Sequence, residues 1–126
     1  MLAGYSYFDS TQLSDLLARS SGARASSLIY ETVENSMTVA TDYVDTHQYL
    51  LYELTLRKLF NELLDVLCDS LISHHIRHMC LDQIYKPLLA LKKYYRSQHG
   101  HLAAYYKLEH ELRVLSFEFL QYKGES

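Results

Sequence analysis

The chain has 126 residues, of which 48% are hydrophobic and 21% are charged, and its formal net charge is −3. This length corresponds to one domain, and the composition excludes a disordered tail. Four Gly and one Pro are too few for the many turns of an all-β fold, so we expect a single helical domain over residues 1–126.

The N-terminal segment, residues 1–9, is too apolar for a free tail because it carries the aromatic side chains of Tyr5, Tyr7 and Phe8. We expect it to pack on the bundle or on a partner. It lacks the basic region and the apolar run of a signal peptide. The chain also has no apolar run long enough to cross a membrane. We therefore expect a cytoplasmic or nuclear protein with no membrane partner.

A short helix is expected next, ended by residues 20–22, which are Ser, Ser and Gly. Ser26 and Ser27 are candidate N-caps for a second helix. Near Asp45 and Thr46 two interpretations compete, because either residue can cap a new helix and a continuous helix is nearly as compatible with the pattern.

The strongest apolar stripe in the middle of the chain belongs to a helix that we expect to fray near residues 78–80. Its members recur at spacings of mostly three or four: Tyr49, Tyr52, Leu56, Leu59, Phe60, Leu63, Leu67 and Leu71. Further apolar residues broaden the stripe beyond one narrow face. A helix of this kind is central in a bundle or buried in an oligomer.

The following helix is expected to be capped by Asp82, with Pro87 in its first turn or at a kink, because Pro has no amide hydrogen to donate. Gly100 then allows either a hairpin turn in the left-handed conformation or a single helix that runs straight through. We favour the hairpin, because Gly inside a helix costs about 1 kcal/mol relative to Ala.

The last helix, residues 101–122, has the clearest apolar seam of the chain. Its positions alternate in spacing between four and three: His101, Tyr105, Leu108, Leu112, Leu115, Phe119 and Tyr122. This period is typical of one helix packed against another. The chain as a whole is therefore predicted to be an all-α bundle of four or five helices, mostly antiparallel, and its completion by dimerisation is a further expectation.

Charge is distributed unevenly along the sequence. Residues 1–70 contain ten acids and four bases, whereas residues 71–126 contain five acids and eight bases. The two halves are expected to attract each other, within one bundle or between two copies.

The stretch 71–107 combines cations with tyrosines and is the best candidate for a polyanion site. Cations neutralise phosphates and aromatic rings stack on bases, so the stretch predicts RNA or DNA binding as one hypothesis. The competing interpretation is a solvated basic face that pairs with the acidic half. The candidate polyanion contacts are Arg77, Lys86, Lys92, Lys93, Arg96 and Lys107.

The histidines and cysteines give little support for a metal or a nucleophile. His74 and His78 are four residues apart, a spacing at which two imidazoles can share a metal, but no third ligand is placed by the sequence. They are weak candidates, and no metal or other cofactor is expected. Cys68 and Cys80 are expected to be buried thiols.

Arg96 and His101 are separated by four residues, an arrangement that resembles the Arg-x4-His signature of the all-α HEPN ribonucleases. The resemblance covers six residues of the 126. It implies RNA cleavage by this pair, provided that both residues lie on one helix. We treat this as the third hypothesis.

The leading hypothesis is a non-enzymatic protein–protein interaction module, such as an adaptor, a scaffold subunit or a small viral or regulatory protein. Such a module acts by docking helix faces through Tyr and Leu anchors surrounded by charge. The partner is expected to be another protein, including a second copy of this chain, and no small-molecule substrate is expected. The predicted partner contacts are Tyr5, Tyr7, Phe8, Tyr94, Tyr95, Tyr105 and Tyr106.

Overall fold

The computed structural model describes residues 13–98 and 100–120 of the chain. Within these ranges it is entirely helical apart from the connections, and no strand occurs. The helices are α1 (Leu13–Ala18), α2 (Gly22–Asp45), α3 (Tyr49–Leu67), α4 (His74–Arg96) and α5 (Leu102–Phe119). The predicted all-α bundle of four or five helices is confirmed.

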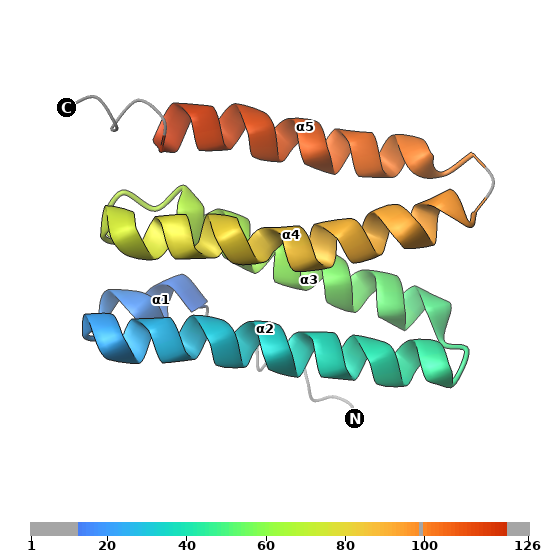
Figure 1. Ribbon diagram of the computed structural model, residues 1–126, viewed down its shortest axis with the longest axis horizontal. Helices are drawn as coiled ribbons and strands as arrows, with labels where there is room; N and C mark the ends of the chain where they lie inside the picture. The colour runs from blue at the N-terminus through green and yellow to red at the C-terminus, as the bar shows by residue number, and fades with distance from the viewer. Residues whose placement is uncertain (1–12, 99, 121–126) are drawn as a thin grey trace.

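The four long helices run antiparallel to one another in chain order (Figure 1). The most extensive contact joins α3 to α4, and α2 packs on both of them. α1 is a single short helix that packs on α2 and α3. α5 packs mainly on α4 and lies at one edge of the arrangement, with α2 at the opposite edge (Figure 1).

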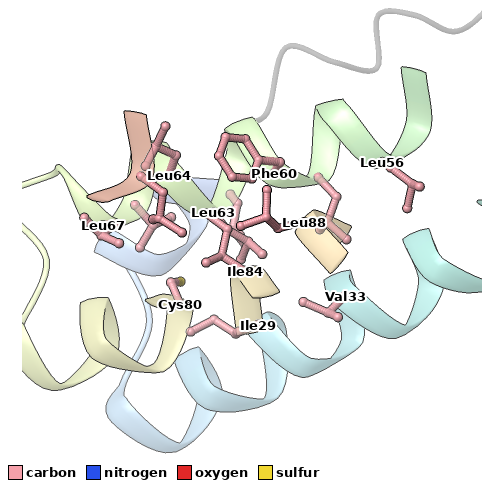
Figure 2. Packing of buried hydrophobic residues seen from close by; sticks show 14 of the residues in the cluster. Ile29, Val33, Leu56, Phe60, Leu63, Leu64, Leu67, Cys80, Ile84 and Leu88 are labelled. Atoms are coloured by element: carbon pink, nitrogen blue, oxygen red, sulfur yellow. The ribbon is translucent and has the colours of Figure 1, made fainter. Parts of the chain in front are cut away.

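The core is centred on α3, whose buried side chains face α4 and α2. Figure 2 shows Phe60 and Leu63 of α3 close to Ile84 and Leu88 of α4, with Ile29 of α2 on the opposite side. Each leucine fully removed from water contributes about 1.5–3 kcal/mol. Five residues of the predicted stripe are buried, as expected: Leu56, Leu59, Phe60, Leu63 and Leu67.

The start of α2 differs from the prediction. Its N-cap is Ser21, whose hydroxyl accepts a hydrogen bond from the backbone N–H of Arg24, and Gly22 begins the helix instead of ending the previous one. Ser26 lies inside the helix and donates its hydroxyl to the carbonyl of Gly22. The first amide groups of a helix have no partner within it, so Gly22 is tolerated at this position.

Of the two interpretations for residues 45–46, the break is correct, but neither residue caps the new helix, because Thr46 is the C-cap of α2 and Gln48 is the N-cap of α3. α2 ends at Asp45, and the Thr46 hydroxyl donates to the carbonyl of Asp42 at 3.1 Å. His47 adopts a positive φ of 61°, a conformation that reverses the chain at some cost for a residue with a side chain. α3 then begins at Tyr49.

The connection between α3 and α4 corrects two predictions. α3 ends at Leu67 and α4 begins at His74, capped by Ser73, so the helix does not continue to residues 78–80 and Asp82 is not a cap. The turn contains neither Gly nor Pro. The carboxylate of Asp69 accepts from the N–H of Leu71 at 2.9 Å, a side-chain turn that apolar periodicity does not reveal.

Because α3 ends and α4 begins earlier than predicted, two further residues lie elsewhere than expected. Leu71 lies in the turn and is 87% exposed, so its assignment to the buried stripe is wrong. Of the two places expected for Pro87, the first turn is wrong, because Pro87 lies inside α4, where it is buried. Since Pro lacks an N–H group, one helical hydrogen bond is missing at this point.

The hairpin at Gly100 is confirmed. α4 ends at Arg96, α5 begins at Leu102, and Gly100 has a φ of 76°. This left-handed conformation is accessible to Gly without steric cost. The seam of α5 is confirmed for Tyr105, Leu108 and Leu112, which are buried. His101 is exposed at the N-cap of the helix, and Tyr122 lies outside the described residues.

Candidate functional site

A shallow, tyrosine-rich hollow lies at the end of the bundle where α2 ends, α3 begins and α4 ends. The described residues that line it are Val44, Tyr49, Tyr52, Lys93, Tyr94, Ser97 and Gln98. Most of its surface is apolar. The tyrosine hydroxyls, the ammonium of Lys93 and the side chains of Ser97 and Gln98 provide polar contacts. This mixture is typical of sites that hold an apolar group in a fixed orientation.

The rings of the hollow are held by contacts between helices. Tyr52 of α3 and Tyr94 of α4 meet edge-to-face, with ring centroids 5.5 Å apart, a favourable arrangement for aromatic rings. Burial and the neighbouring Tyr94 raise the pKa of Tyr52. The hydroxyl of Tyr49, which also lines the hollow, lies 2.9 Å from Nδ1 of His47. Tyr49 is 45% exposed, so its ring is available to a partner.

Tyr95 supports this site from inside the bundle. Its side chain is buried, and its hydroxyl donates to the carboxylate of Glu53 at 2.5 Å. Burial, followed by the bond to Glu53, raises the pKa of Tyr95 to about 12. Its ring lies against that of Tyr94, with centroids 5.6 Å apart. Tyr95 therefore positions Tyr94 and has no surface of its own for a partner.

The structure separates the tyrosines that the sequence grouped as partner contacts. Tyr94 reaches the hollow, whereas Tyr105 is buried in the contact with α4, where the ammonium of Lys92 lies 5.3 Å from the centre of its ring. Tyr106 is 56% exposed on α5. Tyr5, Tyr7 and Phe8 lie outside the described residues.

The hollow also contains residues that sequence reasoning did not assign to a site. Val44 comes from α2, and Tyr49 and Tyr52 come from α3, where the sequence predicts the two tyrosines only as members of an apolar stripe. A usable signal was present: Tyr49 and Tyr52 are tyrosines at the start of a helix, next to the predicted break. Their proximity to Tyr94 depends on how α3 and α4 pack.

Four of the six candidate cations of the stretch 71–107 are exposed, whereas Lys92 is half-buried over the ring of Tyr105 and Arg77 is buried. Lys86, Lys93 and Arg96 are exposed on the outer face of α4, and Lys107 is exposed on α5. Among the described residues, every ion pair joins two side chains of the same helix, and none involves these four cations. The predicted pairing of the basic half with the acidic half is therefore not made through salt bridges in this part of the chain.

Arg77 has a structural role instead. It is buried, its Nε donates to the carbonyl of Leu67 at 2.9 Å, and its guanidinium also donates to the carbonyl of Phe119 at 2.7 Å. These carbonyls belong to the last residues of α3 and α5, the negative ends of the two helices. Arg77 is not part of the exposed basic surface.

His74 and His78, the weak metal candidates, lie together near the start of α4. The rings of His74 and His78 meet edge-on with centroids 4.5 Å apart, and Nε2 of His74 lies 3.4 Å from the carbonyl of Leu120. Among the described residues, no three His, Cys, Asp or Glu side chains are placed to hold a metal. Burial raises the pKa of Cys80 to about 12 and also raises that of Cys68, which disfavours the reactive thiolate.

Arg96 and His101 do not share a helix. Arg96 is the last residue of α4, His101 precedes the first residue of α5, and the turn at Gly100 lies between them. Both are exposed. The resemblance to the HEPN signature required both residues on one helix, and this condition is not met.

None of the described helices combines the length and apolar character needed to cross a membrane. Comparison of the chain with protein-family models, with curated proteins and with solved structures finds no match in any of the three sets.

Proposed function

We propose that the protein is a non-enzymatic interaction module whose tyrosine hollow receives an apolar side chain from a partner protein. The observation that carries the proposal is the meeting of three helix ends around the rings of Tyr49, Tyr52 and Tyr94. Tyrosine is enriched among the residues that dominate binding energy, because it offers a large rigid surface at low entropic cost.

The positive charge beside the hollow indicates which kind of partner segment would bind there. Lys93 forms part of the wall, and Arg96 follows it one turn later on the outer face of α4. Neither cation has an ion-pair partner among the described residues. The best match is a segment with one aliphatic or aromatic anchor flanked by acidic residues, because charge complementarity selects the partner and accelerates association.

The test is a selection from a displayed library of random peptides against the purified full chain. We expect the selected peptides to share an apolar anchor with a neighbouring acid. Tyr49→Ala should weaken their binding at least tenfold, about 1.4 kcal/mol, because it removes a half-exposed ring that lines the hollow. The affinities are measured by isothermal titration calorimetry.

The matched control is Tyr30→Ala. Tyr30 is 50% exposed on α2, similar to the 45% of Tyr49, but it does not line the hollow. Its loss should leave peptide affinity unchanged. A selection without a shared anchor, or equal losses in the two variants, contradicts the proposal.

A second candidate function is the binding of single-stranded RNA or DNA by the outer face of α4. It is favoured by one observation: Lys86, Lys93 and Arg96 are exposed and lack ion-pair partners among the described residues. Tyr85, which is 46% exposed on the same helix, offers a ring on which a base can stack.

This second candidate predicts a steep salt dependence. If the three cations contact phosphates, raising the salt from about 50 to about 200 mM should weaken binding of a single-stranded RNA about twentyfold. Fluorescence anisotropy with a labelled oligonucleotide measures it, and the triple variant Lys86→Ala, Lys93→Ala, Arg96→Ala should lose the binding. The double variant Arg57→Ala, Lys58→Ala, on α3, serves as the control. Binding that survives the triple variant removes this candidate.

A further inference from the structure

The outer face of α5 carries a second apolar stripe, opposite the stripe that packs in the bundle. Tyr106, Val114 and Phe117 are exposed by 56%, 45% and 66%. Figure 1 shows α5 at the edge of the bundle, with its outer side turned away from α4. A helix that is apolar on its outer side as well as its inner side is typical of one that also packs on a partner.

The spacing of these residues places them along one line. Ala103, Tyr106, His110, Val114 and Phe117 follow each other at three, four, four and three residues, so they form one continuous face of the helix. Two shallow hollows adjoin Val114 on this face. The described residues that line them, besides Val114, are Arg113, Phe117 and Glu118 for one, and Lys107, His110, Glu111 and Leu115 for the other.

Charges along one edge of the stripe indicate how a partner helix would lie. Lys107 is near the start of α5 and Glu118 near its end, and both are exposed. They are eleven residues apart, about 16 Å along the helix. In a parallel two-fold pair this edge would face the other edge of the partner's stripe, where Arg113 and Glu109 already form an ion pair within each helix. Two antiparallel copies would place Lys107 beside the partner's Glu118, twice in a symmetric pair.

We propose that the protein forms an antiparallel two-fold dimer through the outer face of α5, with a second copy of this chain as the occupant. The two-fold axis passes midway between Lys107 and Glu118. In this register the partner's Phe117 lies level with Leu108, beside the hollow lined by Lys107 and His110. On the other edge of the stripe, Arg113 is already paired with Glu109 of its own helix at 2.6 Å.

This dimer goes beyond the proposed function because it uses none of the residues that line the tyrosine hollow. The hollow belongs to the ends of α2, α3 and α4, whereas the dimer face belongs to α5. Self-association and peptide binding are therefore measured separately, and a negative result for one proposal does not contradict the other.

The test is a charge exchange followed by sedimentation equilibrium of the full chain. Lys107→Glu and Glu118→Lys should each raise the dimer Kd about tenfold, because each turns two attractive contacts into repulsive ones. The double variant carries the exchanged pair and should return to within about threefold of the original Kd. If the Kd of the double variant rises by as much as the two single changes together, the antiparallel register is wrong.

A second pair of variants tests the face itself. Phe117→Glu places a charge in the centre of the proposed interface and should leave the protein monomeric at concentrations where the original chain is dimeric. Leu54→Glu is the control, since Leu54 is 52% exposed on α3 and should not change the dimer. Thermal unfolding followed by circular dichroism verifies that both variants fold. A monomeric original chain, or equal dissociation of both variants, overturns the proposal.

Discussion

Replacing Arg77 by Met should lower the free energy of unfolding by about 3 kcal/mol. Met retains most of the apolar stem and removes the guanidinium, whose Nε and terminal nitrogen donate to the carbonyls of Leu67 and Phe119. Both acceptors then lose a charge-assisted hydrogen bond, and a buried polar group left without a partner costs about 1–3 kcal/mol. Urea unfolding followed by circular dichroism at 222 nm measures the change.

The position of Arg77 explains why the effect should be large. Two helices end at this corner of the bundle, and the last carbonyls of a helix carry partial negative charge. A single cation near the start of α4 serves both ends, because α3 and α5 run antiparallel to α4. His74 approaches the carbonyl of Leu120 at the same corner. Loss of the guanidinium should therefore loosen the attachment of α5 as well as the end of α3.

Arg57→Met is the matched control. Arg57 lies on α3, its side chain is 45% exposed, and it forms an ion pair with Glu53 at 3.8 Å. Exposed pairs of this kind are worth about 0.2–1 kcal/mol, so the variant should lose at most that amount. If Arg57→Met and Arg77→Met destabilise the protein equally, the structural role given to Arg77 is wrong.

The second large effect is expected for Leu63→Ala. Leu63 is completely buried in the packing of α3 on its neighbours, and Figure 2 shows it beside Ile84. Removing a buried leucine side chain leaves a cavity and costs about 3 kcal/mol or more. The measurement is again chemical unfolding, which for a chain of this size is expected to be a single cooperative transition.

Leu54→Ala makes the same chemical change on the same helix, nine residues earlier. Leu54 is 52% exposed, so its loss should cost less than about 0.5 kcal/mol. A contrast between the two leucines tests which face of α3 is central. If Leu54→Ala costs as much as Leu63→Ala, the outer face of α3 is covered in solution by a partner or a second copy.

The candidate site shows where sequence reasoning is limited. The stretch 71–107 was predicted as one surface because cations and tyrosines alternate in it. Helix packing divides that surface: Arg77 and Tyr95 turn inward to polar acceptors, whereas Lys93 and Tyr94 face the hollow. Neighbouring residues on a helix point in different directions, and only the position of the other helices decides which direction is inside.

The errors in helix boundaries have a similar origin. The turn at Gly100 is favoured by the sequence because Gly is unfavourable inside a helix, and the positive φ of Gly100 agrees with it. The turn between α3 and α4 was missed because Asp69 and Ser73 stabilise it through side-chain hydrogen bonds to backbone N–H groups. Asp and Ser occur in many other contexts, so their presence alone does not predict a turn.

The sequence by itself determined that this protein is helical and identified buried positions of α3 and α5 such as Leu63 and Leu108, whereas at Gly100 it favoured a reversal over a continuous helix. These features depend on interactions between residues a few positions apart, which periodicity records directly. The tertiary structure alone decided the joining of α3 and α5 by Arg77, the meeting of Tyr52 with Tyr94, and the exposure of the outer stripe of α5. Arg77 and Phe119 are 42 positions apart, as are Tyr52 and Tyr94, and no local pattern specifies which helix faces will meet.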